Sequence, residues 1–301
     1  MIKQKKALNL HIRRTAAACC AALAVTAITT TAHAQDLTGA LKKMRDTGNI
    51  TIGHREASQP FSFLDSNKQP VGYAIDLCLK VVDEVRAALK KPDITVTYAM
   101  VNAQTRIPMV ADGSVDLECG STTNTLARQA QVDFSATYFT TGTRLLTWKA
   151  NKAREIENLA DRSIAVVGGS TNEKAVKALI DAGKVKDAKL VVVKDYAEGI
   201  AAVEAKKADA FATDDIVLFG LLAKSASRND LEVVGRFLTY DPYGIMIRRD
   251  DPDFRLAVNR ALARTFRSGD AEKLYAKWFD PMSVPLSPLL KAAFELQAIP
   301  E

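Results

Sequence analysis

The sequence predicts an α/β protein with two lobes, each a mostly parallel sheet flanked by helices, and two hinge strands that join the lobes. Three observations predict this fold. Short runs rich in β-branched residues alternate with segments whose apolar residues recur at helical spacing, which is typical of βαβ units and parallel sheets. The alternation comes in two separate series. One strand-like run lies between the two series, and another follows the second.

The first 34 residues have the pattern of a secretory signal peptide. Five basic residues open the chain: Lys3, Lys5, Lys6, Arg13 and Arg14. A small, apolar stretch follows at 15–28, and Ala32-His33-Ala34 has the A-x-A pattern of a signal-peptidase site. We therefore expect residues 1–34 to be removed and the mature protein to lie in the periplasm. The alternatives, a transmembrane anchor and a lipoprotein at Cys19, would need about 20 strongly apolar residues or a leucine upstream of the cysteine.

Most of the excess positive charge lies in this leader. The chain has 41 Lys and Arg against 35 Asp and Glu; the leader holds five of the basic residues and no acidic ones, which leaves 36 against 35. The high pI therefore does not indicate a nucleic-acid partner. Removing 34 of the 301 residues leaves a chain that can bury a large core and that suits one or two domains.

Two cysteines follow the leader. Cys78 belongs to an apolar helical stripe that should face a core, and Cys119 ends the strand-like run 116–119. In an oxidising periplasm they could form a disulfide, or they could remain two buried thiols that pack as small hydrophobes, and the pattern leaves both readings open. His54 is the only histidine after the leader. We therefore expect no metal site and no cofactor.

The first series of elements builds one lobe. Its expected members, in order, are strand 50–53, a helix over 74–89, strand 94–100, a short helix after Thr105, strand 115–119 and a helix near Leu126. Each strand is followed by a helix, so the strands should run parallel.

The second series repeats this order in a second lobe. Its expected members are strand 164–167, a helix from Thr171, strand 190–193, a helix over 196–206, strand 208–212 and a helix from Ile216. Ser170 and Glu173 have the spacing of a capping box at the start of the first of these helices.

Two strand-like runs, 143–147 and 243–247, are the expected crossings between the lobes. We therefore expect one lobe to comprise residues 35–143 with 244–301 and the other residues 144–243. Two crossings leave a cleft between the lobes and permit hinge closure around a ligand.

The last expected helix begins at Asp251-Pro252, where Asp can cap and Pro fits the first helical position. Its apolar positions lie on one face, which should pack on the first lobe: Phe254, Val258, Leu262 and Phe266.

Several motifs carry a family resemblance. They are Gly53-His54-Arg55-Glu56, residues 104–108, residues 118–124 with Arg128, Asp133-Phe134-Ser135 and residues 142–146. Over nearly the whole chain after the leader, they resemble the periplasmic glutamate/aspartate-binding proteins of amino-acid ABC transporters, in family 3 of the bacterial solute-binding proteins. The resemblance implies the type II periplasmic-binding-protein fold and an amino-acid ligand, glutamate or aspartate above others. It also implies a monomer that delivers the ligand to an inner-membrane ABC transporter permease.

The residues fit an amino acid independently of the resemblance. Its α-carboxylate is best bound by a bidentate guanidinium and by free N–H and hydroxyl groups, which Gly120 to Thr123 and Arg128 offer together. The resemblance assigns this role to Arg128, with Ser121 and Thr123 beside it. A surface salt bridge is the usual alternative for a helical arginine.

The other two charged groups of an acidic amino acid also have candidates. Asp214 lies where a parallel strand ends, which is where α/β ligands bind, and should hold the ammonium group; Asp215 should favour the helix N-terminus. Arg55 and Arg106 lie near the same cleft and suit a second carboxylate. The residues expected to contact ligand are Arg55, Arg106, Ser121, Thr122, Thr123, Arg128, Thr171, Tyr196 and Asp214.

The sequence departs from the family pattern at two positions near the side-chain carboxylate. Tyr196 stands where the pattern has histidine, and Ala103 stands where it has serine. The choice between glutamate, aspartate and another amino acid such as glutamine or asparagine therefore stays open.

Two other function classes are considered. A cyclohexadienyl-dehydratase-like enzyme on the same fold would use Glu173 as a general acid, but the pairing of Arg128 with Asp214 favours a zwitterion binder. A receptor sensor domain would require a membrane span after the second lobe, which we do not expect.

Overall fold

The computed structural model describes residues 37–301, of which Thr38–Glu301 form one compact unit. The expected signal peptide at 1–34, with Cys19, lies outside the described residues. Within residues 37–301 no helix combines the length and the hydropathy needed to cross a bilayer.

The first five-stranded sheet has the order β5-β1-β6-β15-β7. Strand β1 (Asn49–His54) pairs in parallel with β5 (Thr95–Met100) and with β6 (Leu117–Glu118). Strand β15 (Met246–Arg248) lies antiparallel to β6 and to β7 (Val132–Phe134). The chain therefore returns from the second sheet to complete the first.

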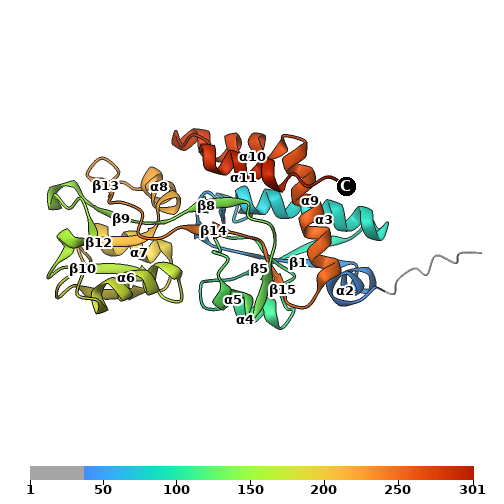
Figure 1. The fold of residues 1–301 in the computed structure, drawn as a ribbon, viewed down its shortest axis with the longest axis horizontal. Coiled ribbons are helices and arrows are strands. Elements are labelled where there is room, and N and C mark those ends of the chain that lie inside the picture. The colour runs from blue at the N-terminus through green and yellow to red at the C-terminus, as the bar shows by residue number, and fades with distance from the viewer. Residues whose placement is uncertain (1–36) are drawn as a thin grey trace, which may run out of the picture. The chain divides into compact units, whose positions relative to one another are not determined.

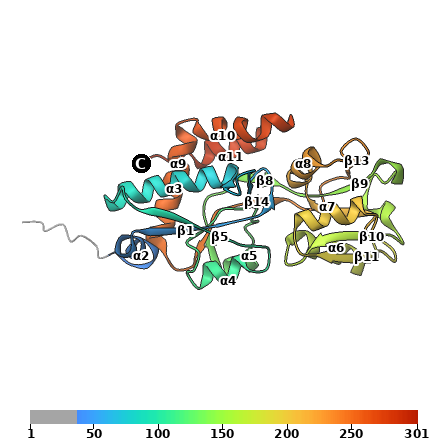
Figure 2. The ribbon, with the colours of Figure 1, turned by 180° about the vertical axis from the view of Figure 1, so that it is seen from behind.

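Helices cover the first sheet, and several of them lie side by side in Figures 1 and 2. Helix α9 (Pro252–Arg267) packs against α3 (Tyr73–Leu89), α10 (Asp270–Phe279), α11 (Pro288–Gln297) and α2 (Gly39–Thr47). The four apolar residues expected on the inner face of α9 are buried, which confirms that this face packs against the other helices of the first lobe. Asp251 caps α9 by accepting the Phe254 N–H, as predicted.

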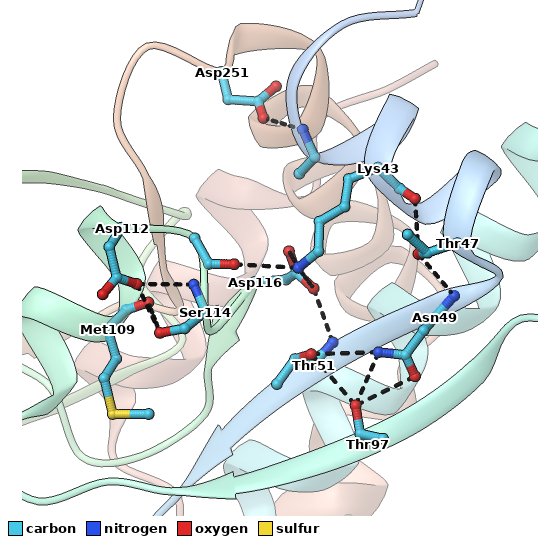
Figure 3. Close-up of polar contacts among 12 residues, drawn as sticks. Lys43, Thr47, Asn49, Thr51, Thr97, Met109, Asp112, Ser114, Asp116 and Asp251 are labelled. Atoms are coloured by element: carbon cyan, nitrogen blue, oxygen red, sulfur yellow. Dashed lines mark hydrogen bonds and ion pairs between the residues drawn. The ribbon is translucent and has the colours of Figure 1, made fainter.

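A buried carboxylate ties α2 to the first sheet (Figure 3). Asp116 accepts two hydrogen bonds from Lys43 Nζ, at 2.9 and 3.0 Å, and one from the Thr51 N–H at 2.8 Å. Asp251 also accepts the Ala40 N–H at 2.6 Å, so the start of α2 is bound to the start of α9. These contacts join segments that lie far apart in the sequence.

The second five-stranded sheet has the order β11-β10-β12-β9-β13. Strand β10 (Ser163–Val167) pairs in parallel with β11 (Lys189–Val193) and β12 (Ala210–Asp214). Strand β9 (Thr143–Trp148) is antiparallel to β12 and to β13 (Leu231–Val234). The three parallel strands agree with the second predicted series.

One helix follows each of the parallel strands of this sheet: α6 (Thr171–Asp181), α7 (Tyr196–Glu204) and α8 (Asp215–Lys224). At the start of α6, Ser170 Oγ accepts the Glu173 N–H at 3.0 Å, which is half of the predicted capping box. The Glu173 carboxylate accepts the Gly169 N–H at 2.7 Å, not the Ser170 N–H, because Ser170 already donates to the Val167 carbonyl.

The two crossings lie a few residues earlier than predicted. Strands β8 (Phe139–Thr141) and β14 (Asp241–Tyr243) form a two-stranded antiparallel ribbon between the two sheets. The predicted crossing 143–147 is instead part of β9. Of the predicted crossing 243–247, Tyr243 ends β14, and Met246 and Ile247 begin β15, where their side chains are buried in the first sheet. We keep the lobe boundaries after residues 143 and 243 as a proposal, with β8 and β14 as the connecting strands.

The small sheet between β1 and α3 is one of the features that the sequence did not predict. Strands β2 (Ala57–Ser58), β3 (Ser62–Leu64) and β4 (Pro70–Val71) form a small antiparallel sheet between β1 and α3.

A disulfide joins Cys78 of α3 to Cys119, with the Cα atoms 6.3 Å apart. Of the two alternatives that the sequence left open, a disulfide or two buried thiols, the structure shows the disulfide.

Candidate ligand-binding site

The predicted site residues lie at strand ends and helix starts of both sheets. Arg55 follows β1, and 121–123 follow β6; Arg106 begins α4 (Arg106–Ala111), and Arg128 lies in α5 (Leu126–Gln129). From the second sheet come Thr171 and Tyr196, the first residues of α6 and α7, and Asp214, the last residue of β12. The carboxyl ends of parallel strands are the usual ligand-binding edge of α/β sheets.

Side chains from the two sheets meet directly. Ser121 Oγ lies 3.1 Å from the Tyr196 hydroxyl, and Thr123 Oγ1 lies 3.4 Å from Thr171 Oγ1. Gln104, which sequence reasoning did not select, donates to the Gly168 carbonyl at 2.8 Å. The expected contact residues of the two lobes therefore form one cluster.

Arg128 makes no ion pair with a side chain among residues 37–301, so the expected alternative of a surface salt bridge is wrong. Its Nη1 donates to the Thr123 carbonyl at 2.8 Å, and its Nη2 lies 3.5 Å from the Gly169 carbonyl on the other side of the cluster. The side chain is buried, and burial lowers the pKa of the guanidinium from its ordinary value. A buried guanidinium held by carbonyls keeps its charge available to an anion.

Two more guanidinium groups are buried beside it. Arg55 and Arg106 are 2% and 3% exposed. Arg106 Nη1 donates to Thr122 Oγ1 at 2.6 Å, whereas the Arg55 guanidinium lies over the Tyr196 ring, 5.2 Å from its centroid. Burial, with repulsion from Arg128 and Arg55, lowers the pKa of Arg106 to about 10. Within residues 37–301, Arg55 Nη1 and Arg106 Nε have no hydrogen-bond partner.

Glu118, at the end of β6, is the acid among these arginines that sequence reasoning missed. It is fully buried, and its Oε2 accepts the Thr122 hydroxyl at 2.5 Å, while Oε1 has no hydrogen-bond partner in the described part of the chain. Thr122 thus stands between Glu118 and Arg106. One buried carboxylate offsets one of the three guanidiniums, so the cluster keeps a net positive charge.

The Asp214 carboxylate is buried on the second sheet's side of the cluster. Its Oδ1 accepts from Asn172 Nδ2 at 2.7 Å, and its Oδ2 accepts from the Tyr243 hydroxyl. Burial, together with the neighbouring Asp241, raises the pKa of Asp214 to about 7. Asp215 accepts from the Thr141 hydroxyl and from the Ile216 N–H at the start of α8, which confirms its expected place at a helix N-terminus.

A cavity of about 280 Å³ opens beside Arg55 and Tyr196, between the end of β5 and the start of α7. A second cavity of similar volume lies over α8, α10 and α11 and is lined mainly by aromatic and aliphatic side chains. Of these two cavities, the first adjoins the arginine cluster through Arg55 and Tyr196, whereas Arg128 and Asp214 line neither of them.

Comparison with known proteins agrees with this geometry. Residues 50–281 match the family described as bacterial extracellular solute-binding proteins, family 3. The L-glutamate/L-aspartate-binding protein of Pseudomonas aeruginosa is 42% identical over 247 residues, 82% of each chain. The glutamate/aspartate import solute-binding protein of Escherichia coli is 38% identical over 263 residues, 85% of this chain and 87% of the relative.

Among solved structures, an ancestral amino-acid-binding protein, described as a precursor of cyclohexadienyl dehydratase, is 31% identical with a TM-score of 0.68. The match covers 80% of this chain and 100% of that one. The likeness confirms the fold class predicted from the sequence.

Proposed function

This chain belongs to family 3 of the bacterial extracellular solute-binding proteins, and on that premise we propose that it captures an acidic amino acid, glutamate or aspartate, for import. One observation carries the choice of ligand. Three buried guanidiniums have no ion-pair partner among residues 37–301, and two of them have an unbound N–H group. Buried donors without acceptors are costly, and a ligand with two carboxylates would supply those acceptors.

Each charged group of the ligand has a partner in this proposal. The α-carboxylate is bound by Arg128, with the hydroxyls of Ser121 and Thr123 and with Thr171 at its edge. The ammonium group is bound by Asp214, whose carboxylate has neutral donors as its hydrogen-bond partners. An α-amino acid bound in this way contacts residues of both sheets.

The side-chain carboxylate is bound by Arg55 and Arg106 in this proposal. Thr122 orients Arg106, and the Tyr196 ring supports the Arg55 guanidinium from one face. A neutral amide such as glutamine would supply one carbonyl where an acid supplies a carboxylate, so it would leave more of this positive charge unpaired. The cluster therefore favours the binding of acidic amino acids over that of their amides, even with Ala103 and Tyr196 in place of the family's serine and histidine.

We further propose that the mature protein is a periplasmic monomer, exported with the leader 1–34, that delivers its ligand to an inner-membrane ABC transporter permease. The name of the Escherichia coli relative, an import solute-binding protein, supports the import role. Catalysis by Glu173 is not favoured, because this carboxylate accepts the Gly169 N–H at the start of α6.

The proposal is tested by calorimetric titration of ligand-stripped protein with glutamate, aspartate, glutamine, asparagine, arginine and histidine at one pH and ionic strength. We expect the two acids to bind at least tenfold more tightly than their amides, a difference of about 1.4 kcal/mol or more. Equal or tighter binding of an amide or a basic amino acid would contradict the ligand assignment. Turnover of prephenate or arogenate would contradict the binding role.

A further inference from the structure

We propose that Asp241 is a second acidic residue of the ammonium subsite, and that Asp214, with Asp241 nearby, holds a proton in the ligand-free protein that the ligand's ammonium group displaces. This inference rests on the proposed function and adds a proton to its binding reaction. Asp214 ends β12 and Asp241 begins the hinge strand β14. The two side chains are 2% and 3% exposed.

A directed chain of hydrogen bonds joins the two carboxylates. Asn172 Nδ2 donates to Asp214 Oδ1 and to Thr143 Oγ1, at 2.7 Å each. Thr143 Oγ1 lies 2.8 Å from Thr239 Oγ1, and the Thr239 hydroxyl donates to Asp241. A hydroxyl has one hydrogen to donate, so Thr143 must donate to Thr239. Both carboxylates therefore accept from neutral donors at the two ends of one network.

Neither carboxylate forms an ion pair within residues 37–301. The charged or titratable groups that act on Asp214 are Asp241 and Tyr243 of β14, Asp215 of α8 and Arg128 of α5. Two of these four groups are carboxyl groups, and Arg128 is the cation among them. Burial without a paired cation favours the neutral form of a carboxyl group, and a second carboxylate nearby favours it further. These effects outweigh the hydrogen bonds from Tyr243 and Asn172, which favour the ionised form, and they raise the pKa of Asp214 to about 7.

The ammonium group of an amino acid would reverse this balance. A cation against Asp214 favours its ionised form, so the carboxyl proton leaves to solvent as the ion pair forms. Because the ionised form binds, affinity should be constant well above the pKa of Asp214 and should fall as the pH drops below it. The loss approaches tenfold per pH unit.

Calorimetry with glutamate in phosphate and in imidazole, which both buffer around neutral pH and whose ionisation enthalpies differ, measures this proton at pH 6, 7 and 8. We expect release of roughly one proton at pH 6, about half at pH 7 and little at pH 8. Asp241→Asn removes the like charge while keeping an acceptor for Thr239, so it should bind glutamate and release fewer protons at pH 7. The matched control is Asp215→Asn, whose effect should be smaller because its charge acts on Asp214 less strongly than that of Asp241.

The outcomes separate the two proposals. Binding with the same enthalpy in both buffers at pH 6 and 7 overturns the proton release, and an Asp241→Asn variant identical to wild type overturns the role of Asp241. If neither acid binds, the proposed function fails, and the inference is then decided on ligand-free protein by carbon-13 NMR of the Asp214 carboxyl group. A titration midpoint near neutral pH supports it, and one near pH 4 overturns it.

Discussion

Arg128 differs from the other two buried arginines in being held by carbonyls from both sides of the cluster. If it binds the α-carboxylate, which every amino acid has, Arg128→Ala should abolish the binding of all amino acids tested by calorimetry. Truncating one member of a buried charge pair costs about 2–5 kcal/mol, which is roughly 30-fold to several thousand-fold in affinity. The control is Arg236→Ala, because Arg236 pairs with Glu155 and Glu157 at the surface. Full affinity in Arg128→Ala would remove this assignment.

Tyr196 has two separable features, a ring under Arg55 and a hydroxyl beside Ser121. A cation–π contact is worth about 0.5–2 kcal/mol. We therefore expect Tyr196→Phe, which keeps the ring, to change glutamate affinity by a few-fold, and Tyr196→Leu to reduce it by about tenfold or more. Equal affinities of the two variants would show that the ring does not support Arg55.

At this scale the sequence was informative for residues that carry a motif or follow a strand. All nine expected residues lie in the cluster, although their roles as ligand contacts remain a prediction. Asn172 was missed because it acts through partners distant in sequence: it joins Thr143 to Asp214, and helical periodicity does not reveal such a contact. Glu118 and Asp241 bind Thr122 and Thr239, which lie close in sequence, and they were missed because only the fold shows that these carboxylates are buried.

At the scale of elements, long periodic segments were predicted well and short ones were not. Helices α3 and α9 begin within about a residue of their expected starts, because apolar periodicity and a Pro at the first position are strong local signals. Strands β8 and β14 have three residues each, too few for alternation to be read, so the apolar runs beside them were taken for the crossings. Whether such a short segment forms a strand depends on its pairing with other strands in the folded structure.

The disulfide joins helix α3 to the segment after β6, across 41 residues of sequence. Closing a loop of this length restricts the unfolded chain and should contribute about 4 kcal/mol. We therefore expect the Cys78→Ala, Cys119→Ala double variant to unfold at a clearly lower urea concentration than oxidised wild type, and wild type with reductant to match it. An unchanged midpoint would contradict a stabilising bridge.

At the scale of the whole molecule, the site is completed only by residues of both sheets. Ligand should therefore draw the lobes together about the β8–β14 ribbon, as hinge proteins do. Small-angle scattering of ligand-stripped protein should show a smaller radius of gyration when glutamate is added to saturation. An unchanged radius, with binding confirmed by calorimetry, would contradict closure.

In the proposed site, the excess of buried guanidinium charge selects an acidic ligand, and calorimetry of Arg106→Gln and Arg55→Gln with glutamate and glutamine measures that selection. At least one variant should lose glutamate affinity by about 30-fold or more, while glutamine affinity changes far less. Ligand-free melting temperatures should stay close to wild type, since these arginines have no ion-pair partner within residues 37–301 to lose. Wild-type glutamate affinity in both variants would show that these guanidiniums do not bind the side-chain carboxylate.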